Sequence, residues 1–408
     1  MKIDADAAGM SASRLARIED HLQRRYIEPG KIAGCQVAVV RRGALAHFSS
    51  LGLRDRERDL PVDDATIWRI YSMTKPITGV ALMTLYEQGH FQLGDPVHRF
   101  IPSWRDLKVA ERDPDGSTRL VEPVRPMSIK DLMMHTAGLG YGPGNADLEP
   151  GLIGKASKES PVRPDQNLEA MVARMAGDPL RFHPGTHWLY SLGTDVCARL
   201  VEIISGRPFD EYLRSEIFEP LGMVDTAFYV PDDKIDRFAA SYGRNSRKEL
   251  KLVDDPLTSS YRTEPMMLSG GGGLVSTTND YVQFCRMLVN GGELDGRRIL
   301  SRKTIELMAT NHLPGNGQLR DFAQPGSYGE VGFDGMGFGL TMSVSLGPAA
   351  TQLVGSGGEY MWGGAASTAF WVDPAEELTV VFMTQLLPSG TFNFRDQLKT
   401  IVYGAIED

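Results

Sequence analysis

The chain has 408 residues, of which 42% are hydrophobic and 23% charged, a composition typical of a globular protein with a large core. A formal net charge of −9 without a long basic run argues against electrostatic binding of nucleic acid. The charged N-terminus leaves no apolar signal-peptide core, and no stretch approaches the roughly 20 apolar residues of a membrane span. Three widely spaced cysteines without CxxC spacing predict buried thiols, so we expect a cytoplasmic protein.

The first ninety residues predict a helix, a β-hairpin and a second helix. The spacing of apolar residues indicates a helix over 11–26, then strands at 35–40 and 46–53. The second helix is expected from residue 70 to Gly89, because a glycine can end it. Pro76 fits only the first turn of this helix, which places Ser72 at or just before the helix N-terminus.

The rest of the chain predicts helices first and strands later. We expect helices near residues 129–134, 194–205, 280–290 and 301–310, strands at 339–346, 368–372 and 378–384, and a final helix at 393–406. Strands at both ends indicate an α+β fold in which an antiparallel sheet is built from both termini and flanked by helices. We predict an α/β domain from residues 1–85 and 196–408, with 86–195 as an inserted, mainly helical domain. Residues 141–165 read as a long loop, which in a compact domain is often functional.

Ser72 and Lys75 form a Ser-x-x-Lys motif at the start of the predicted helix. Residues three apart share a helix face, so the lysine can reach the serine hydroxyl. A free serine is a weak nucleophile that needs an adjacent base, and the N–H groups of a helix N-terminus can hold an oxyanion. Taken alone, a four-residue match is better explained by a helix-capping serine followed by a solvated lysine.

Further motifs follow in order along most of the chain. They are Leu132-Met133-Met134-His135-Thr136-Ala137-Gly138-Leu139, Pro184-Gly185-Thr186-His187-Trp188-Leu189-Tyr190-Ser191, Gly271-Gly272-Gly273-Leu274-Val275-Ser276-Thr277, Trp362-Gly363-Gly364-Ala365 and Asp373-Pro374. With Ser-x-x-Lys, this ordered set resembles the serine beta-lactamase and penicillin-binding protein superfamily, in particular the class C beta-lactamase-like carboxylesterases called family VIII. The resemblance implies the beta-lactamase/transpeptidase-like fold and a serine hydrolase that needs no cofactor or metal.

The resemblance also implies roles for single residues. Tyr190 matches the tyrosine of the class C Tyr-x-Asn motif and would be the general base, with Lys75 holding it in its ionised form. The Ser72 and Ala365 N–H groups would form the oxyanion hole. Leu192 stands where lactamases carry the asparagine.

The third motif of the superfamily also differs. Trp362-Gly363-Gly364 stands where lactamases carry Lys-Thr-Gly, so these three residues would line an apolar substrate site without the cation that recognises a carboxylate.

We therefore expect a carboxylesterase that hydrolyses short-chain acyl esters through an acyl-enzyme, with a small-molecule ester as its partner. A beta-lactamase or D-alanyl-D-alanine peptidase is an alternative, as is an acyltransferase that uses the same acyl-enzyme. An inert module of the same fold would be expected to have lost Ser72, Lys75 or Tyr190. The natural ester and the oligomeric state do not follow from the sequence.

Other catalytic motifs are absent or weak. The chain has no Gly-x-Ser-x-Gly and no HExxH, and Pro184-Gly185 interrupts the helix that a zinc pair of His183 and His187 would need. The run Gly270–Gly273 matches a phosphate loop only in glycine content, so a turn or a close backbone approach is the better interpretation. We expect His135 to be structural.

Overall fold

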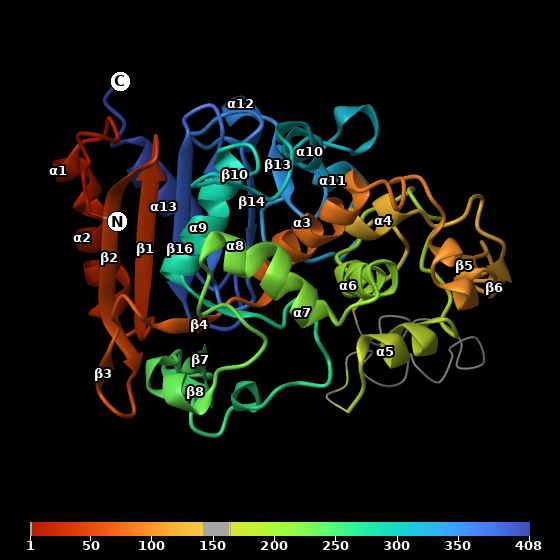
Figure 1. Ribbon diagram of the computed structural model, residues 1–408, viewed down its shortest axis with the longest axis horizontal. Coiled ribbons are helices and arrows are strands. Elements are labelled where there is room, and N and C mark those ends of the chain that lie inside the picture. The colour runs from red at the N-terminus through yellow and green to blue at the C-terminus, as the bar shows by residue number, and fades with distance from the viewer. Residues whose placement is uncertain (1, 142–162, 164) are drawn as a thin grey trace.

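An eight-stranded antiparallel sheet runs through the body of the protein in the computed structural model, which describes residues 2–141, 163 and 165–408 (Figure 1). The strands pair in the order β12-β13-β14-β15-β16-β1-β2-β3. Their bounds are Gly34–Arg41 (β1), Ala44–Asp55 (β2), Leu60–Pro61 (β3), Met336–Phe338 (β12), Ser343–Ser345 (β13), Tyr360–Gly363 (β14), Ala369–Asp373 (β15) and Leu378–Thr384 (β16). Strands from both ends of the chain therefore meet at the β16–β1 pair.

Alternating side chains give the sheet two cores. In β1, Cys35, Val37 and Val39 belong to one hydrophobic cluster, whereas Ala38 and Val40 belong to the other. Successive side chains of a strand point to opposite faces, so a strand buried on both faces reads as a nearly continuous apolar run. Helices must then cover both faces of the sheet.

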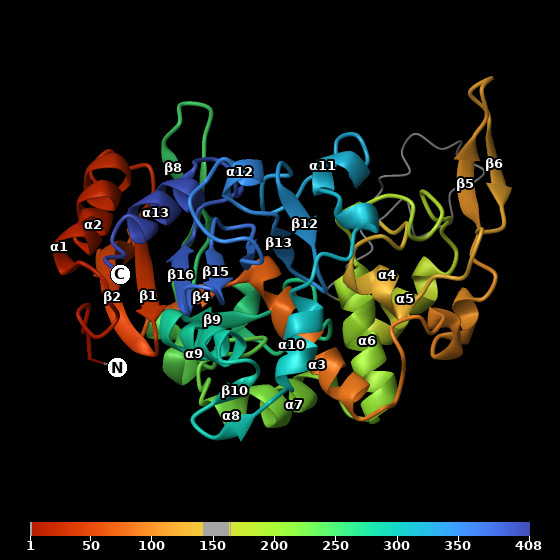
Figure 2. The ribbon, with the colours of Figure 1, turned by 90° about the horizontal axis from the view of Figure 1, so that it is seen from above.

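Figure 2 shows the two helical layers on either side of the sheet. The outer face is covered by α1 (Ala12–Leu15), α2 (Arg17–Leu22) and α13 (Phe394–Tyr403), and the inner face by α3 (Thr74–Glu87) and α9 (Thr278–Val289). Every residue of α3 from Thr74 to Leu85 is buried, as expected for a helix enclosed by the core. A π-helical turn at Gln23–Ile27 continues α2.

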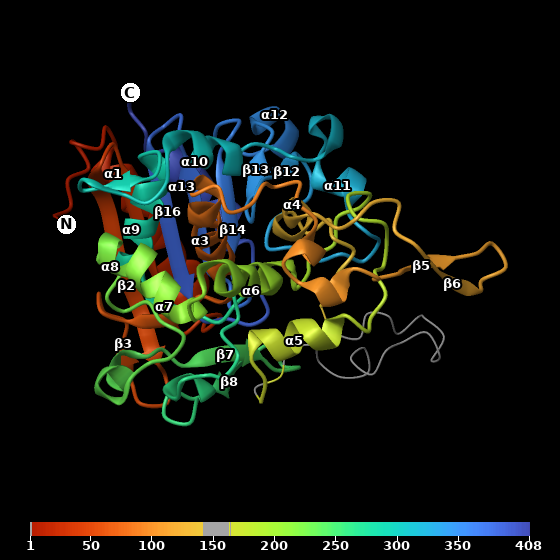
Figure 3. The same cartoon turned by 45° about the vertical axis from the view of Figure 1, so that its right-hand side comes forward.

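The remaining elements lie mainly beside and in front of the inner layer, and a β-hairpin projects from the far end (Figure 3). The helices are α4 (Ile129–Met133), α5 (Leu168–Met175), α6 (Gly193–Ser205), α7 (Phe209–Leu213), α8 (Glu219–Leu221), α10 (Arg302–Met308), α11 (Leu319–Phe322) and α12 (Pro348–Thr351). The two-stranded sheets are β4 (Ile67–Arg69) with β9 (Val275–Thr277), β5 (Val109–Arg112) with β6 (Thr118–Val121), β7 (Ser241–Arg244) with β8 (Leu250–Asp254), and β10 (Glu293–Leu294) with β11 (Arg297–Arg298). The β5–β6 pair is the projecting hairpin.

The predicted fold class is confirmed, because one antiparallel sheet built from both ends of the chain is flanked by helices. The single strand expected over 339–346 is wrong. The chain reverses there between β12 and β13, with Gly339 N–H donating to Met342 O at 2.8 Å and Thr341 at a φ of 69°. The division at residues 85 and 195 stays a prediction, and most of the 141–165 loop lies outside the described residues.

The cysteines and the apolar helices bear on two expectations from the sequence. Cys35, Cys197 and Cys285 are all buried free thiols, as predicted. Within the ranges that the structure describes, no helix combines the length and apolar character needed to cross a bilayer.

Candidate active site

Ser72 lies in a tight turn that joins a strand to the central helix. β4 leads into a 3₁₀ turn, Tyr71–Met73, and α3 starts at Thr74. Tyr71 has a φ of 43°, in the left-handed region that non-glycine residues rarely occupy and that often marks functional sites. Ser72 is buried, with 9% of its surface exposed. The turn thus presents the serine at the N-terminal end of a fully buried helix.

Lys75 is completely buried directly behind Ser72. Its Nζ donates to Ser72 Oγ at 3.3 Å, to Tyr141 Oη at 2.8 Å and to the Gly271 carbonyl at 2.6 Å. Burial lowers the pKa of Lys75 to about 8, although the negative charges of Asp195 and Glu330 oppose this. The spacing of the Ser-x-x-Lys motif therefore does bring the two side chains into contact.

Tyr190 meets the same group of atoms from a different part of the chain. The Lys75 Nζ lies 4.6 Å from the centre of its ring, and Trp362 Nε1–H donates to its hydroxyl at 3.3 Å. Burial raises the pKa of Tyr190 well above its usual value, and Glu330 adds to the rise, whereas hydrogen bonds with Ser72 and Trp362 oppose it.

The directions of the two pKa shifts differ from the expectation of an ionised Tyr190 beside a charged Lys75. Burial removes water from both side chains, and water is what stabilises their charged forms. The resting site therefore favours a neutral phenol and a lysine that can lose its proton near pH 8.

Tyr141 is a member of this cluster that the sequence motifs did not identify. Its hydroxyl accepts the Lys75 hydrogen bond, and its ring centre lies 5.3 Å from that of Tyr190. The only signal in the sequence was its place at the start of the predicted 141–165 loop. The functional role expected of that loop concerns mainly residues 142–162 and 164, which lie outside the described part of the chain.

Asp195 is a second residue that the motifs did not identify. Its Oδ1 accepts from Gly271 N–H at 3.0 Å and from Ser269 Oγ–H at 2.5 Å, so it holds the loop whose carbonyl binds Lys75. A Cβ on Gly271 would collide with the Asp195 carboxylate. The expected close backbone approach in the run Gly270–Gly273 is confirmed.

The end of β14 lies against the serine turn. Trp362 is buried and its ring centre is 5.4 Å from that of Tyr190. A Cβ on Gly364 would lie closer than 3.0 Å to the Ile70 carbonyl oxygen, a separation that real Cβ atoms essentially never show. Glycine is thus required where the chain approaching Ala365 meets the segment carrying Ser72.

His135, His183 and His187 each make contacts of their own. His135 is fully buried beside Tyr190, its Nδ1 is hydrogen-bonded to Ser191 Oγ at 3.1 Å, and burial lowers its pKa well below the usual value. His183 Nε2 is instead 2.8 Å from Glu111 Oε1, while His187 Nδ1 contacts the Thr186 hydroxyl. In the ranges with described side chains, no three His, Cys, Asp or Glu residues are grouped to hold a metal.

Comparison with known proteins identifies the family. Residues 16–403 match the family model described as Beta-lactamase. The chain belongs to the beta-lactamase family. The predicted resemblance is confirmed, and with it the prediction of a beta-lactamase-like serine hydrolase.

Individual relatives cover nearly the whole chain. Protein Rv1367c of Mycobacterium tuberculosis is 33% identical over 369 residues, covering 90% of this chain and 88% of that protein. Esterase EstB of Burkholderia gladioli is 29% identical, with 95% of each chain covered. The solved structure of EstCE1, a hydrolase with promiscuous acyltransferase activity, superimposes with a TM-score of 0.76 over 97% of this chain and 99% of that one, at 24% identity. At that identity, the structural likeness shows the shared fold.

Proposed function

We propose that this beta-lactamase-family protein is a serine carboxylesterase that cleaves short-chain acyl esters through an acyl-enzyme. In the first step Ser72 Oγ attacks the ester carbonyl carbon and its proton passes to Tyr190. The alcohol then leaves with a proton returned by Tyr190. In the second step water attacks the acyl-enzyme, the acid is released, and Ser72 regains its proton. The sum is ester plus water giving acid plus alcohol.

The proton path rests on Ser72, whose hydroxyl is hydrogen-bonded both to Lys75 Nζ, at 3.3 Å, and to Tyr190. In its neutral form Lys75 can accept a proton within the hydrogen-bond network that joins Lys75 Nζ, Ser72 Oγ and the Tyr190 hydroxyl, so the tyrosine need not be ionised beforehand. This assignment keeps Tyr190 as the base that contacts the nucleophile and makes Lys75 its proton acceptor.

The oxyanion would be held by the Ser72 and Ala365 N–H groups. The close contact of Gly364 with Ile70 supports this assignment, because it places the residues after β14 beside the serine turn. Each such donor is typically worth about 3 kcal/mol in the transition state.

The observation that carries the choice of an ester is the environment of Trp362. Its indole N–H faces the Tyr190 hydroxyl at 3.3 Å, where lactamases by resemblance place a lysine that anchors a carboxylate. An indole supplies apolar surface and one neutral donor, so the site favours an uncharged ester over an anionic lactam. Leu192, buried at the start of α6, likewise replaces an amide with an apolar side chain.

Acyl transfer is the second candidate, since the neighbour EstCE1 combines hydrolase and acyltransferase activities by its description. The same acyl-enzyme would then be attacked by an alcohol instead of water. Adding increasing concentrations of a short alcohol and measuring ester product against free acid decides between the two. The small-molecule substrate follows from the proposal, and the cytoplasmic location stays a prediction.

The decisive experiment compares Ser72→Ala with Ser49→Ala, a buried serine on β2 that is hydrogen-bonded to His47. Hydrolysis of p-nitrophenyl butyrate should vanish in the first variant and persist in the second. Intact-protein mass spectrometry should show one fluorophosphonate adduct on Ser72 in the wild type. Turnover by Ser72→Ala, an adduct on another serine, or faster hydrolysis of nitrocefin than of the ester would reject the proposal.

A further inference from the structure

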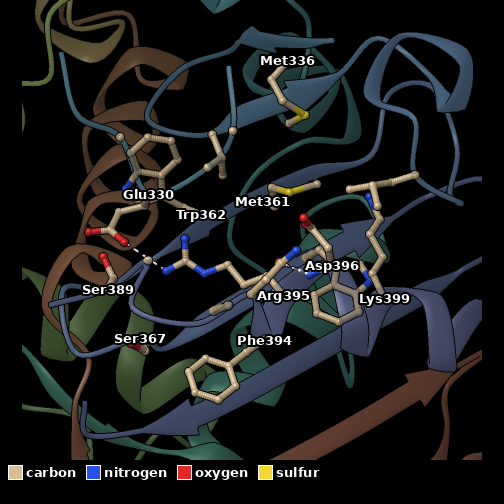
Figure 4. Close-up of a pocket in the computed structure, with 18 of the residues that line it drawn as sticks. Glu330, Met336, Met361, Trp362, Ser367, Ser389, Phe394, Arg395, Asp396 and Lys399 are labelled. Carbon is tan, nitrogen blue, oxygen red and sulfur yellow. Dashed lines mark hydrogen bonds and ion pairs between the residues drawn. The ribbon is translucent and has the colours of Figure 1, made fainter. Parts of the chain in front are cut away.

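A buried carboxylate beside the site has no part in the chemistry described above. Glu330 precedes β12, and its side chain is 1% exposed. One of its oxygens accepts a hydrogen bond from Tyr328 Oη at 3.0 Å. The other accepts one from Arg395 Nη2 at 3.0 Å (Figure 4). The Tyr328 ring in turn lies 6.3 Å from that of Tyr190. Glu330 is therefore fixed close to the catalytic cluster by partners from two segments.

Arg395 connects this carboxylate to the turn after β14. It lies in the first turn of α13, and its Nη2 donates both to Glu330 and to the Thr368 carbonyl at 3.0 Å. The same carbonyl accepts the Gly364 N–H at 3.0 Å, which closes the 364–368 turn. Gly363 leaves the space that the guanidinium fills, because a Cβ there would collide with it.

We propose that Glu330 and Arg395 act as a positioning pair for the active site. Arg395 holds the turn that presents the Ala365 amide, and Glu330 places a fixed negative charge beside Lys75 and Tyr190. The inference deepens the proposed function and rests on it. Neither residue touches the reacting atoms; both act through the groups that do.

The charges around Lys75 determine the direction of the expected effect. Among the described residues, Asp195 on α6 and Glu330 are the carboxylates that raise the pKa of Lys75 against the effect of burial. Glu330 also raises the pKa of Tyr190, to which Tyr328 contributes in the same direction. Removing the Glu330 charge should therefore lower the pKa of the proton-accepting pair.

His135 and Tyr141 also lie beside Lys75 and Tyr190, but they do not change the expected direction of the pKa shift. His135 is held neutral by burial and by the Lys75 charge. Tyr141, whose pKa is raised by burial, stays a neutral acceptor for Lys75.

The same helix provides a matched control one turn away. Lys399 on α13 pairs with the fully buried Glu359 at 2.5 Å. Arg395, Lys399 and Met361 all line a cavity of about 480 Å³ beside β14 and β15 (Figure 4). Glu359 is thus, like Glu330, a buried carboxylate paired with a cation of α13, but its charge is not among those that shift the pKa of Lys75 or Tyr190.

The first test is the pH profile of kcat/KM for p-nitrophenyl butyrate in Glu330→Gln and Glu359→Gln. The acid limb should move to lower pH by about 0.5–1 unit in Glu330→Gln, because a negative charge that raises the pKa of Lys75 and of Tyr190 is removed. It should stay in place in Glu359→Gln. An unmoved limb in Glu330→Gln, or an equal shift in both variants, would overturn the electrostatic half of the proposal.

The second test addresses Arg395. Arg395→Ala should lower kcat about 10–100-fold with KM changed less than about twofold. The reason is that the 364–368 turn, which presents the Ala365 amide, loses its hydrogen bond from Arg395. Arg395→Lys, which keeps the charge and one donor, should recover part of the loss. An unchanged kcat in Arg395→Ala, or no recovery with lysine, would overturn the positional half.

Failure of the proposed function is distinguishable from failure of this inference. If the wild-type protein hydrolyses no ester, the esterase proposal fails. The pH dependence of Ser72 labelling by the fluorophosphonate can then still be measured in the wild type and in Glu330→Gln. The acid limb of labelling is expected to move to lower pH in Glu330→Gln.

Discussion

Replacing Gly364 by alanine tests whether the contact between β14 and the serine turn sets catalytic geometry. The added Cβ would lie closer than 3.0 Å to the Ile70 carbonyl oxygen and to Thr368 Oγ1. Relieving both contacts needs a displacement on the order of 1 Å, and misplacement of that size can reduce catalysis about 100-fold. Overpacking a buried contact also typically lowers the free energy of unfolding by about 1–3 kcal/mol.

The matched control is Gly357→Ala, since the nearest atoms to a Cβ there lie 3.8 Å away. We expect kcat for p-nitrophenyl butyrate to fall about 100-fold in Gly364→Ala and to change less than about twofold in Gly357→Ala. Thermal unfolding should show that Gly364→Ala is folded at the assay temperature. If folded Gly364→Ala keeps kcat within about threefold of the wild type, the contact does not set the geometry of the oxyanion hole.

Two further predictions concern the proton path. Because burial lowers the pKa of Lys75 to about 8 and the accepting form is the neutral one, kcat/KM should rise with pH through about pH 8. A profile that is already flat above pH 6 would contradict the assignment of Lys75. Tyr190→Phe should lower kcat about 10²–10⁴-fold with little change in the thermal midpoint. Tyr212→Phe, which removes another buried hydroxyl that is hydrogen-bonded to Thr84, should leave kcat unchanged. A loss below about tenfold in Tyr190→Phe would remove this residue from the path.

Short-range patterns in the sequence predicted much of the fold. The apolar runs of β1 and β16 and the helical spacing before and after them reflect local geometry, and the structure confirms a sheet from both chain ends. The strand expected over 339–346 failed because Gly339 and Thr341 form a reverse turn packed against Met308 and Met133. Those contacts join residues far apart in the chain, and no local pattern contains them.

The sequence by itself determined that Ser72 and Lys75 would meet, because residues three apart at a helix start share one face. Only the tertiary structure decided what surrounds them. Tyr190, Asp195 and Glu330 come from segments more than a hundred residues away from Lys75. Burial then lowers the pKa of the lysine to about 8 and raises that of the tyrosine, which disfavours the ionised Tyr190 expected from sequence. The cost of removing a charged group from water depends on everything packed around it, and that is a property of the folded chain alone.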